Sequence, residues 1–320
     1  MSELKYNILG KSKFEVSKLS FGSLTISPLQ KNMPVNEGAK LIVEAYEKGV
    51  NILDTANLYE NYPHIKEALK SIKREKFHII TKDYCYDEKT AKLSLEKALK
   101  ELDTDYIDGF LLHEQESEHT IRGHYKALEY LFKMKEKGYI KSLGISTHFV
   151  QGVKGAIKYS DILDIIHPIV NISGIGINDG DINQMLNAIK LAKEKNFGIY
   201  AMKPLGGGRH ISDYEKALDF VLNISELDSI AIGMQNSLEL EMNILKFNDL
   251  EISLDLRNKL TKNKRRLNIA SWCTGCQKCI KRCKQNALYI EDNKAKVDMD
   301  KCVLCGYCMK ECEDFCIKII

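Results

Sequence analysis

The sequence predicts an α/β fold in which a closed (β/α)8 barrel precedes a small C-terminal α+β domain. Two observations predict this architecture. Eight short β-branched segments alternate with amphipathic segments across roughly the first 250 residues, whereas the last fifty or so carry a doubled cysteine pattern. The chain has 320 residues, of which 44% are hydrophobic and 28% are charged. It is therefore long enough for one large domain and one small one.

The barrel prediction rests on the order of these segments. The candidate strands lie at Lys18–Leu24, Asn51–Asp54, His78–Thr81, Ile107–His113, Ile140–Ile145, Leu163–Val170, Gly198–Met202 and Ser229–Ile232. The helical patterns lie at Val35–Lys48, Ile65–Ile72, Glu88–Glu101, Ile121–Lys137, Val150–Tyr159, Ile182–Lys195, Tyr214–Leu222 and Leu238–Lys246. Strands separated by one helix need right-handed crossovers, which make a parallel sheet. Eight such units close most naturally into a TIM-type barrel.

The residues around the first strand favour a barrel over an open, doubly wound sheet. An open sheet would carry a glycine-rich dinucleotide motif after that strand, and Phe21–Leu24 is not one. The preceding segment Tyr6–Ser17 is predicted to form a hairpin that turns at Gly10. We expect this hairpin to plug the N-terminal end of the barrel.

Eight of the ten cysteines form two copies of one spacing, and the second copy begins 29 residues after the first. The copies are Cys273, Cys276, Cys279, Cys283 and Cys302, Cys305, Cys308, Cys312. In such a run three thiolates bind one 4Fe–4S cluster and the fourth crosses to the other cluster. Zinc is the main alternative, but its cysteine ligands come as separated pairs rather than as runs of three plus one. The sequence therefore predicts two 4Fe–4S clusters.

Residues 270–320 resemble a bacterial two-cluster ferredoxin. The resemblance implies two ligand sets, which are Cys273, Cys276, Cys279 and Cys312 for cluster 1, and Cys302, Cys305, Cys308 and Cys283 for cluster 2. Proline usually follows each fourth cysteine in that family, whereas Lys284 and Glu313 stand there in this chain. This departure affects the local packing around the clusters and their reduction potentials, because solvent and hydrogen bonds to sulfur tune those potentials. A ninth cysteine, Cys316, is expected to be a small buried residue and not a ligand.

In a (β/α)8 barrel the chemistry lies at the carboxyl ends of the strands, where four polar residues stand: Asp54, Tyr59, Lys82 and His113. Each alone has an ordinary structural explanation, such as a helix cap or a satisfied core histidine. Together they suit the reduction of a carbonyl, in which Tyr59 would donate a proton to the developing alkoxide. Lys82 would lower the pKa of Tyr59, and Asp54 would hold the Lys82 ammonium. His113 would orient the carbonyl oxygen.

Because these four residues come in this order on the ends of strands two to four, residues 1–250 resemble the aldo-keto reductase family. The resemblance implies that NAD(P)H delivers hydride to a small-molecule aldehyde or ketone while Tyr59 protonates the oxygen. It also implies cofactor contacts at Gly22, Ser23, Ser146, Thr147, Met202, Leu205, Gly206, Gly207, Gly233, Met234 and Asn243. In the family, asparagine commonly stands at the position of Thr147 and an aromatic residue at that of Met202.

Two loops are expected to hold the cofactor's phosphates. The glycine triplet Gly206–Gly208 and the loop at Gly233 would place backbone amides around the pyrophosphate. In family members that prefer NADPH, basic residues near the positions of Gly233 and Glu239 bind the 2′-phosphate. Glu239 would repel that phosphate, so we expect the cofactor preference to be weak or to lean towards NADH.

The chain is predicted to divide into a barrel (1–250), a basic helical linker (251–269) and a cluster domain (270–320). The cations of the linker are Arg257, Lys259, Lys262, Lys264, Arg265 and Arg266, with no acid among them. Most such runs are the solvated face of a helix, and a minority steer an acidic partner, for which an external ferredoxin or flavodoxin would qualify. Cys85, close to Lys82, is expected to be an incidental thiol.

Composition and charge exclude several classes of protein. The net charge is only +3, which gives no reason to expect a nucleic-acid partner. No apolar stretch approaches the ~20 residues of a spanning helix, and none at the N-terminus resembles a signal peptide. Thiolate clusters suit a reducing compartment. We therefore expect a cytoplasmic protein without a membrane partner.

Three functions remain open on sequence alone. The first is carbonyl reduction with a nicotinamide cofactor, with the clusters transferring electrons. The second is one-electron chemistry in a barrel that holds a flavin or a reducible substrate, because clusters move one electron and hydride carries two. No flavin motif is evident, however. The third is an inactive barrel whose clusters are structural or form a docking module.

Overall fold

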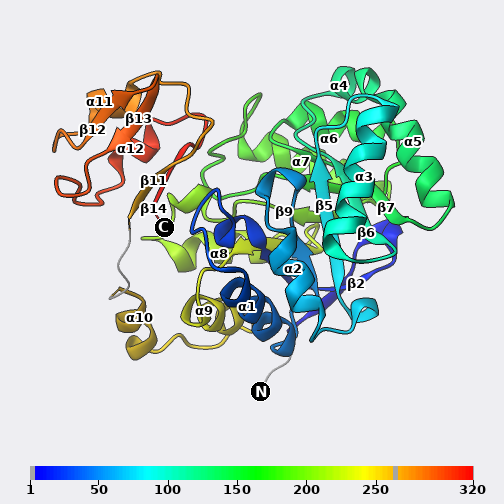
Figure 1. Cartoon of the computed structure of the whole chain (residues 1–320), viewed down its shortest axis with the longest axis horizontal. Coiled ribbons are helices and arrows are strands. Elements are labelled where there is room, and N and C mark those ends of the chain that lie inside the picture. Colours follow the sequence, from blue (N-terminus) through cyan, green and yellow to red (C-terminus); the bar gives the residue numbers. More distant parts are fainter. Residues whose placement is uncertain (1–3, 262–265, 320) are drawn as a thin grey trace.

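Eight parallel strands close into a barrel. The computed structural model describes residues 4–261 and 266–319. Each barrel strand pairs with the next in chain order, and the last closes the ring against the first. Figure 1 shows helices around the barrel and the orange and red C-terminal domain to one side. The strands are β3 (Leu19–Gly22), β4 (Ile52–Asp54), β5 (His78–Asp83), β6 (Ile107–Leu112), β7 (Ile140–Thr147), β8 (Ile165–Pro168), β9 (Gly198–Ala201) and β10 (Ser229–Gly233). The (β/α)8 prediction is confirmed.

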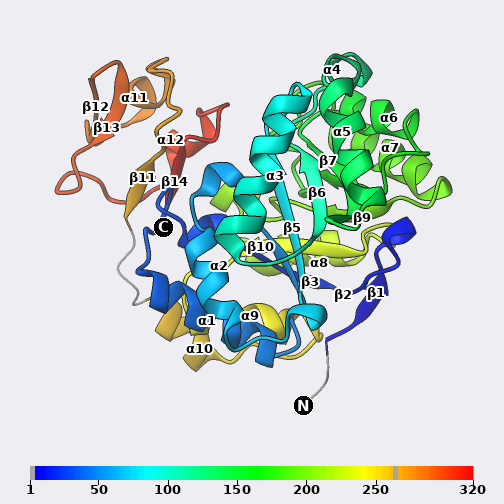
Figure 2. The same ribbon diagram turned by 45° about the vertical axis from the view of Figure 1, so that its right-hand side comes forward.

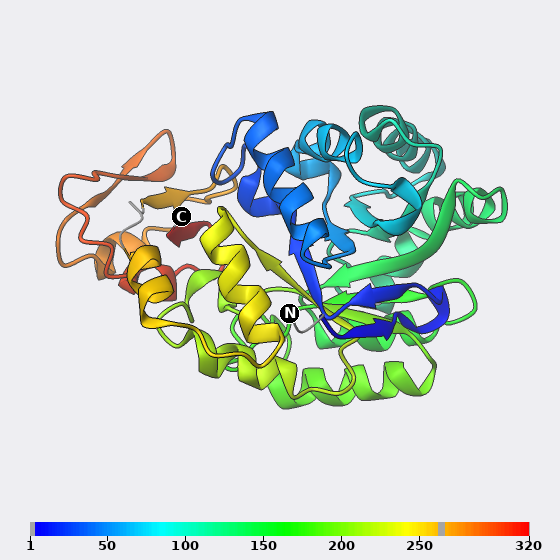
Figure 3. The ribbon, with the colours of Figure 1, turned by 90° about the horizontal axis from the view of Figure 1, so that it is seen from below.

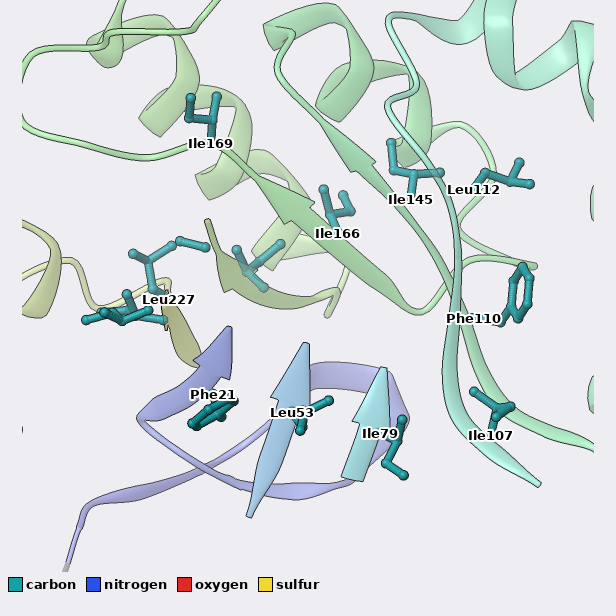
Figure 4. Close-up of a cluster of buried hydrophobic side chains, with 14 of the residues drawn as sticks. Phe21, Leu53, Ile79, Ile107, Phe110, Leu112, Ile145, Ile166, Ile169 and Leu227 are labelled. Atoms are coloured by element: carbon teal, nitrogen blue, oxygen red, sulfur yellow. The ribbon is translucent and has the colours of Figure 1, made fainter. Parts of the chain in front are cut away.

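Alternate side chains along the strands serve two hydrophobic cores. One core, inside the barrel, contains Ile52, Ile80 and Leu111. Their neighbours Leu53 and Ile79 belong instead to the core that packs against the helices (Figure 4). Successive side chains of a strand face opposite sides of a sheet, so apolar runs without polar interruption suit strands that are buried on both faces.

The surrounding helices are α1 (Val35–Glu47), α2 (Tyr62–Leu69), α3 (Glu88–Leu102), α4 (Glu118–Gly123), α5 (Tyr125–Glu136), α6 (Val150–Ile157), α7 (Ile182–Glu194), α8 (Tyr214–Leu222) and α9 (Ser237–Phe247). The segment Ile121–Lys137, predicted as one helix, is divided between α4 and α5 because the backbone at His124 leaves the α region. Among the described residues, none of the helices has the length and apolar character needed to cross a membrane.

An N-terminal hairpin plugs the bottom of the barrel, as predicted. Its strands β1 (Tyr6–Ile8) and β2 (Glu15–Ser17) are antiparallel, and Leu9 and Val16 join the core inside the barrel. Gly10, at φ +45°, approaches the chain so closely that a Cβ there would lie 2.1 Å from the nitrogen of Gly198. Figure 3 shows the dark blue hairpin on the side opposite the orange and red C-terminal domain.

The C-terminal domain is a small α+β unit, as predicted. Its elements are β11 (Leu267–Ile269), α11 (Lys278–Arg282), β12 (Leu288–Glu291), β13 (Lys294–Val297), α12 (Tyr307–Lys310) and β14 (Ile317–Ile319). β11 pairs antiparallel with β14, and β12 with β13. Residues 267–269, which the sequence places in the linker, therefore belong to this domain's sheet. Figure 2 shows β11 and β14 on the side of the domain that meets the barrel.

The predicted linker is partly a barrel helix. α10 (Leu254–Thr261) buries Leu256 and Leu260 in a small core shared with α9. Of the basic run, Arg257 pairs with Glu215 and Lys259 with Asp255. Lys262, Lys264 and Arg265 lie outside the described residues, and Arg266 is exposed.

Candidate active site

Asp54 and Lys82 form a buried ion pair at the carboxyl end of the barrel. Asp54 closes β4 and Lys82 lies in the neighbouring β5, so parallel pairing brings them together. The Lys82 ammonium donates to Asp54 Oδ1 at 2.6 Å and to the carbonyl oxygen of Thr55 at 2.7 Å. The two side chains belong to residues only 5% and 1% exposed. Burial lowers the pKa of Lys82 and Asp54 opposes that shift, so the carboxylate fixes the ammonium in place.

Tyr59 lies beside this pair, at the end of a short 3-10 helix, η3 (Asn57–Tyr59). Lys82 Nζ lies 5.0 Å from the centre of the Tyr59 ring, so the cation faces the ring. Within the described part of the chain the Tyr59 hydroxyl has no hydrogen-bond partner, which leaves it open to a ligand.

The expectation of a lowered pKa for Tyr59 is wrong for the resting site. Burial raises the pKa of Tyr59 well above 10, and the charges of Asp54 and Glu114 add to the shift. The main physical reason is burial, which disfavours the charged phenolate, while Asp54 balances part of the Lys82 charge. The resting site therefore keeps Tyr59 protonated.

His113 follows β6 and completes the group of four. Its ring lies edge-on to that of Tyr59, with 6.3 Å between the centroids, and stacks on Tyr84 at 4.6 Å. Burial, followed by the charge of Lys82, lowers the pKa of His113 well below 6.5, so the imidazole is neutral. Its Nδ1 atom is buried without a partner among residues 4–261 and 266–319. A neutral imidazole beside an open hydroxyl suits a polar ligand group.

Two buried residues that the sequence analysis missed also contact Asp54. Tyr200 of β9 donates its hydroxyl to Asp54 Oδ1 at 3.1 Å, and His167 Nε2 of β8 lies 3.4 Å from the same oxygen. The rings of His167 and Tyr200 stack with 3.8 Å between centroids. Burial lowers the pKa of His167 to about 4. A signal was available, because both are polar-tipped residues in otherwise apolar strands.

The expected cofactor residues on the first and last barrel strands form a tight junction. Gly22 and Gly233 pair across β3 and β10, and a Cβ on Gly22 would lie 3.1 Å from the backbone nitrogen of Gly233. A Cβ on Gly233 would lie 2.1 Å from Thr25 Cγ2. Ser23 donates to the carbonyl oxygen of Asp54 at 2.8 Å. Close packing thus explains these residues, and their contact with a cofactor stays a prediction.

Ser146 and Thr147 close β7 and use their hydroxyls differently. Ser146 Oγ accepts the backbone N–H of Glu114 at 2.9 Å. Thr147 Oγ1 accepts the N–H of Phe149 at 2.9 Å, and its side chain is buried. Both residues are fully buried, and their contact with a cofactor stays a prediction. Two further expected contacts are the half-buried Met202 and the buried Met234.

The glycine triplet Gly206–Gly208, which forms the 3-10 helix η5, is not an open cradle. Gly207 adopts φ +66°, and a Cβ there would lie 2.8 Å from the ring of Phe315, while one on Gly208 would meet Met309. The N–H of Gly206 donates to the Lys203 carbonyl oxygen and that of Gly208 to the Leu205 carbonyl oxygen. Two amides expected around a pyrophosphate are therefore already used, and these glycines accommodate the C-terminal domain.

The start of α9 is occupied by its own side chains. Asn236 accepts the N–H of Glu239, and the Glu239 carboxylate accepts the N–H of Gln235. Asn243, an expected cofactor contact, accepts from the Tyr214 hydroxyl and donates to the carbonyl oxygen of Glu239. A helix start that is capped by Asn236 and carries the Glu239 carboxylate offers little to a further anion. The described residues thus fit the nicotinamide end of a dinucleotide better than its pyrophosphate end.

Each predicted set of cluster ligands lines one cavity of the C-terminal domain. Cys273, Cys276, Cys279 and Cys312 line the first, and Cys283, Cys302, Cys305 and Cys308 line the second. The fourth cysteine of each run thus lies with three from the other run, as crossed ligation requires. No described group of three or more His, Cys, Asp or Glu closes tightly enough for a single metal ion. The bonds to iron stay a prediction.

The two remaining cysteines are buried. Cys316 lines the first cavity, and its backbone N–H donates to Cys312 Sγ at 3.2 Å. An N–H bond of this kind to a cluster sulfur tunes the reduction potential. Cys85 is 1% exposed, and burial raises its pKa to about 12, which is the state of an inert thiol.

The C-terminal domain docks on the loops that follow β8 and β9. Phe315 packs into the outer core of the barrel, over Gly176 and Gly207. Arg209 donates to the carbonyl oxygens of Met309 and Cys312, and its guanidinium lies 4.6 Å from the centre of the Phe315 ring. The segment that carries Cys312, an expected ligand of cluster 1, therefore contacts the barrel.

Comparisons with known proteins match both parts of the chain. Residues 18–221 match a model described as "Aldo/keto reductase family", and residues 266–313 one described as "4Fe-4S dicluster domain". A Glycine max protein that carries the name aldo-keto reductase 1 is 30% identical over 217 residues, covering 62% of this chain and 59% of that protein. Methylglyoxal reductase DkgA of Escherichia coli is 31% identical over 130 residues, covering 40% of this chain and 46% of that protein.

The chain thus spans about half the length of these curated relatives. Among solved structures, an aldo-keto reductase from Bacillus halodurans in its holo form superposes with a TM-score of 0.63 at 20% identity. The superposition covers 81% of this chain and 96% of that one, and it shows a shared fold.

Proposed function

Since the chain belongs to the aldo/keto reductase family and carries a 4Fe–4S dicluster domain, we propose that it reduces an aldehyde or ketone with Tyr59 as the proton donor. The observation that carries this proposal is the open hydroxyl of Tyr59. Tyr59 lies beside the Lys82–Asp54 ion pair and the neutral ring of His113. A carbonyl oxygen bound there would meet one O–H donor and one neutral imidazole.

The raised pKa of Tyr59 suits this role. At neutral pH the phenol is protonated, so it can donate a hydrogen bond to the carbonyl oxygen before reaction. When hydride adds to the carbonyl carbon, the oxygen becomes an alkoxide, a much stronger base than a phenolate, and takes the phenol proton. The Lys82 ammonium near the ring then stabilises the phenolate, while Asp54 keeps the ammonium in position. His113 positions the oxygen from its other side.

NAD(P)H is the hydride donor that we propose, and it would supply the two electrons as hydride. Gly22, Ser146 and Met202 would lie at its nicotinamide end. The pyrophosphate end fits less well, because Phe315 covers the glycine triplet and Glu239 occupies the start of α9. Binding of a whole dinucleotide therefore requires the cluster domain to move.

Anaerobic assays of iron-replete protein test this proposal. A panel of aldehydes and ketones is offered with NADH or NADPH, and nucleotide binding is followed separately by the fluorescence of the reduced nicotinamide. We expect carbonyl-dependent oxidation of one nucleotide. Nucleotide binding without turnover of any carbonyl would count against the reaction, whereas no binding would count against the cofactor.

A second candidate is a reduction fed by the clusters, one electron at a time. The contact of Arg209 with the carbonyl oxygens of Met309 and Cys312 favours it, because cluster 1 then lies next to the barrel loops. An external ferredoxin or flavodoxin is the partner that we propose for cluster 2. Nothing in the described residues adds support for a flavin in the barrel.

Electron paramagnetic resonance distinguishes this candidate from clusters that are only structural. The clusters are reduced with dithionite under anaerobic conditions, and nicotinamide cofactor, flavin and carbonyl compounds are added in turn. Reoxidation faster than in buffer identifies an electron acceptor. If no addition speeds reoxidation while NAD(P)H-dependent turnover persists, the two domains do not exchange electrons. An inactive barrel would show neither behaviour.

A further inference from the structure

We propose that Lys203 and His148 form a binding site for a carboxylate or phosphate group on the substrate. The inference rests on the proposed function, because it concerns the far end of the molecule whose carbonyl meets Tyr59. It names a substrate class, which is a carbonyl compound that carries an anionic group.

The first observation is the position of Lys203. It follows β9 at φ +56°, a left-handed conformation that a side chain adopts only at a cost, and the N–H of Gly206 secures its carbonyl oxygen. Its Nζ lies 2.8 Å from His148 Nε2. Within residues 4–261 and 266–319, no carboxylate forms an ion pair with Lys203. An imidazole is therefore the polar partner of this ammonium.

The second observation is the charge around Lys203. The groups that act on it are Lys318, Lys82 and Arg209, all cations, and the carboxylate of Glu114. Glu114 already accepts the Tyr84 hydroxyl. A desolvated ammonium among cations is unfavourable without a counter-charge. In agreement, burial and then Lys318 lower the pKa of Lys203 to about 7, and burial and then Lys203 lower that of His148 well below 6.5.

The third observation is that this pair shares the barrel mouth with the catalytic group. His148 directly follows β7 and Lys203 closely follows β9, so both stand at carboxyl ends of strands, as His113 does. The charges of Lys203 and His148 both act on His113. A ligand whose carbonyl oxygen lies at Tyr59 would thus extend towards the ammonium.

A competing explanation is that Arg209 and Lys203 both balance the negative charge of cluster 1. Their contacts distinguish the two residues. Arg209 holds the carbonyl oxygens of Met309 and Cys312, so it serves the cluster side. Lys203 lies against the Phe315 ring, 4.8 Å from its centre, and its hydrogen bond runs to a barrel residue. We therefore assign Arg209 to cluster 1 and Lys203 to the barrel mouth.

Binding of a matched pair of aldehydes tests the assignment. The probes are 4-oxobutanoate, which carries a carboxylate, and butanal, which does not. Affinities are measured calorimetrically on the iron-replete full chain with Tyr59→Phe, which separates binding from turnover. Lys203→Met should weaken 4-oxobutanoate binding about 10- to 100-fold, the range for a hydrogen bond to a charged group, and leave butanal unchanged. Lys190→Met, an exposed lysine on α7, is the matched control.

Three outcomes would overturn the site. If Lys203→Met weakened the binding of butanal and of 4-oxobutanoate equally, Lys203 would be structural. Loss of NADH or NADPH binding with 4-oxobutanoate unaffected would make it a cofactor residue. A shift in the potential of cluster 1 with unchanged aldehyde binding would make it a counter-charge to iron. If Lys203→Met fails to fold, Lys203→Arg should retain 4-oxobutanoate binding and His148→Gln should weaken it. Binding without any turnover by the unmutated chain would instead refute the proposed reaction alone.

Discussion

Tyr200 donates its phenol hydroxyl to the carboxylate of Asp54 at 3.1 Å, on the oxygen that also accepts the Lys82 ammonium. A buried carboxylate oxygen thus ties the seventh barrel strand to the second and third. Because the Lys82 ammonium is held through Asp54, the position of the charge near Tyr59 depends on a residue that is far from it in sequence. Tyr200 is therefore a positioning residue in the proposed mechanism.

Replacing Tyr59 by phenylalanine should remove carbonyl reduction. The hydroxyl is the proposed proton donor, and general acid catalysis typically contributes 10²–10⁴-fold, so kcat should fall by about that factor. Binding of the nicotinamide nucleotide should stay within a few-fold, measured by fluorescence titration. Tyr86→Phe, an exposed tyrosine, serves as the control. Unchanged kcat in Tyr59→Phe would remove this residue from the mechanism.

Replacing Tyr200 by phenylalanine should loosen Asp54. A hydrogen bond to a charged group is worth about 1.5–3 kcal/mol, so the free energy of unfolding should fall by about that amount in denaturant titrations. We also expect kcat to fall while KM changes little, because the substrate does not touch Tyr200. A variant with lower stability but unaltered kcat would show that Tyr200 is structural only.

Stability should fall on mild acidification because of His167. Its pKa is about 4 in the folded protein and about 6.5 in an unfolded chain, so the unfolded state binds the proton first as the pH drops. Above about pH 6.5 the His167 ring is neutral in both states and costs no stability. As the pH falls from there towards 4, the free energy of unfolding falls, by about 1.4 kcal/mol per pH unit at most. Denaturant titrations at pH 7, 6 and 5 measure it, with visible absorbance reporting cluster integrity.

The slope of the unfolding free energy against pH reports how many protons the chain takes up when it unfolds. His167→Gln should reduce that number by up to one over this range. His119→Gln, an exposed histidine whose side chain is 77% accessible, is the control and should leave the slope unaltered. An identical slope in His167→Gln and the unmutated chain would show that this ring does not resist protonation.

Iron analysis should find about eight irons per chain, since two cubanes hold four each. Cys283→Ala should disrupt mainly cluster 2, whose other ligands are expected to come from the second cysteine run, because Cys283 lines the same cavity as those three thiols. Cys316→Ser should keep the full iron content. Stoichiometric zinc after anaerobic purification would refute the cluster assignment, and disruption of cluster 1 in Cys283→Ala would refute crossed ligation.

The fold followed from periodicity because parallel strands buried on both faces need uninterrupted apolar runs. Ile52-Leu53 and Ile79-Ile80 are such runs, in which one side chain enters the barrel and the next faces the helices. The break at His124 could not be foreseen, since the apolar period continues through it. Pairing of β11 with β14 escaped prediction too, because both are three-residue strands at opposite ends of the cluster domain.

The candidate site was foreseeable where it depends on strand ends and not where it depends on packing between distant segments. Asp54, Lys82 and His113 stand at strand ends, and parallel pairing alone brings them together. The pKa of Tyr59 was misjudged, because it depends first on burial and then on the charge of Asp54. The role of Gly207 was also missed, because it depends on Phe315, more than 100 residues later.

Phe315 stands three residues after Cys312, the last expected ligand of cluster 1. The ring that covers the glycine triplet is therefore linked through a short segment to that ligand. The order of assembly follows from this. A chain made without iron leaves the cysteine segments untethered, because metal binding supplies much of the folding energy of such small domains. We expect the barrel to fold first and its mouth to be covered only when cluster 1 is in place. Iron supply would then decide how freely ligands reach the barrel, which hydrogen exchange at residues 206–210 would reveal.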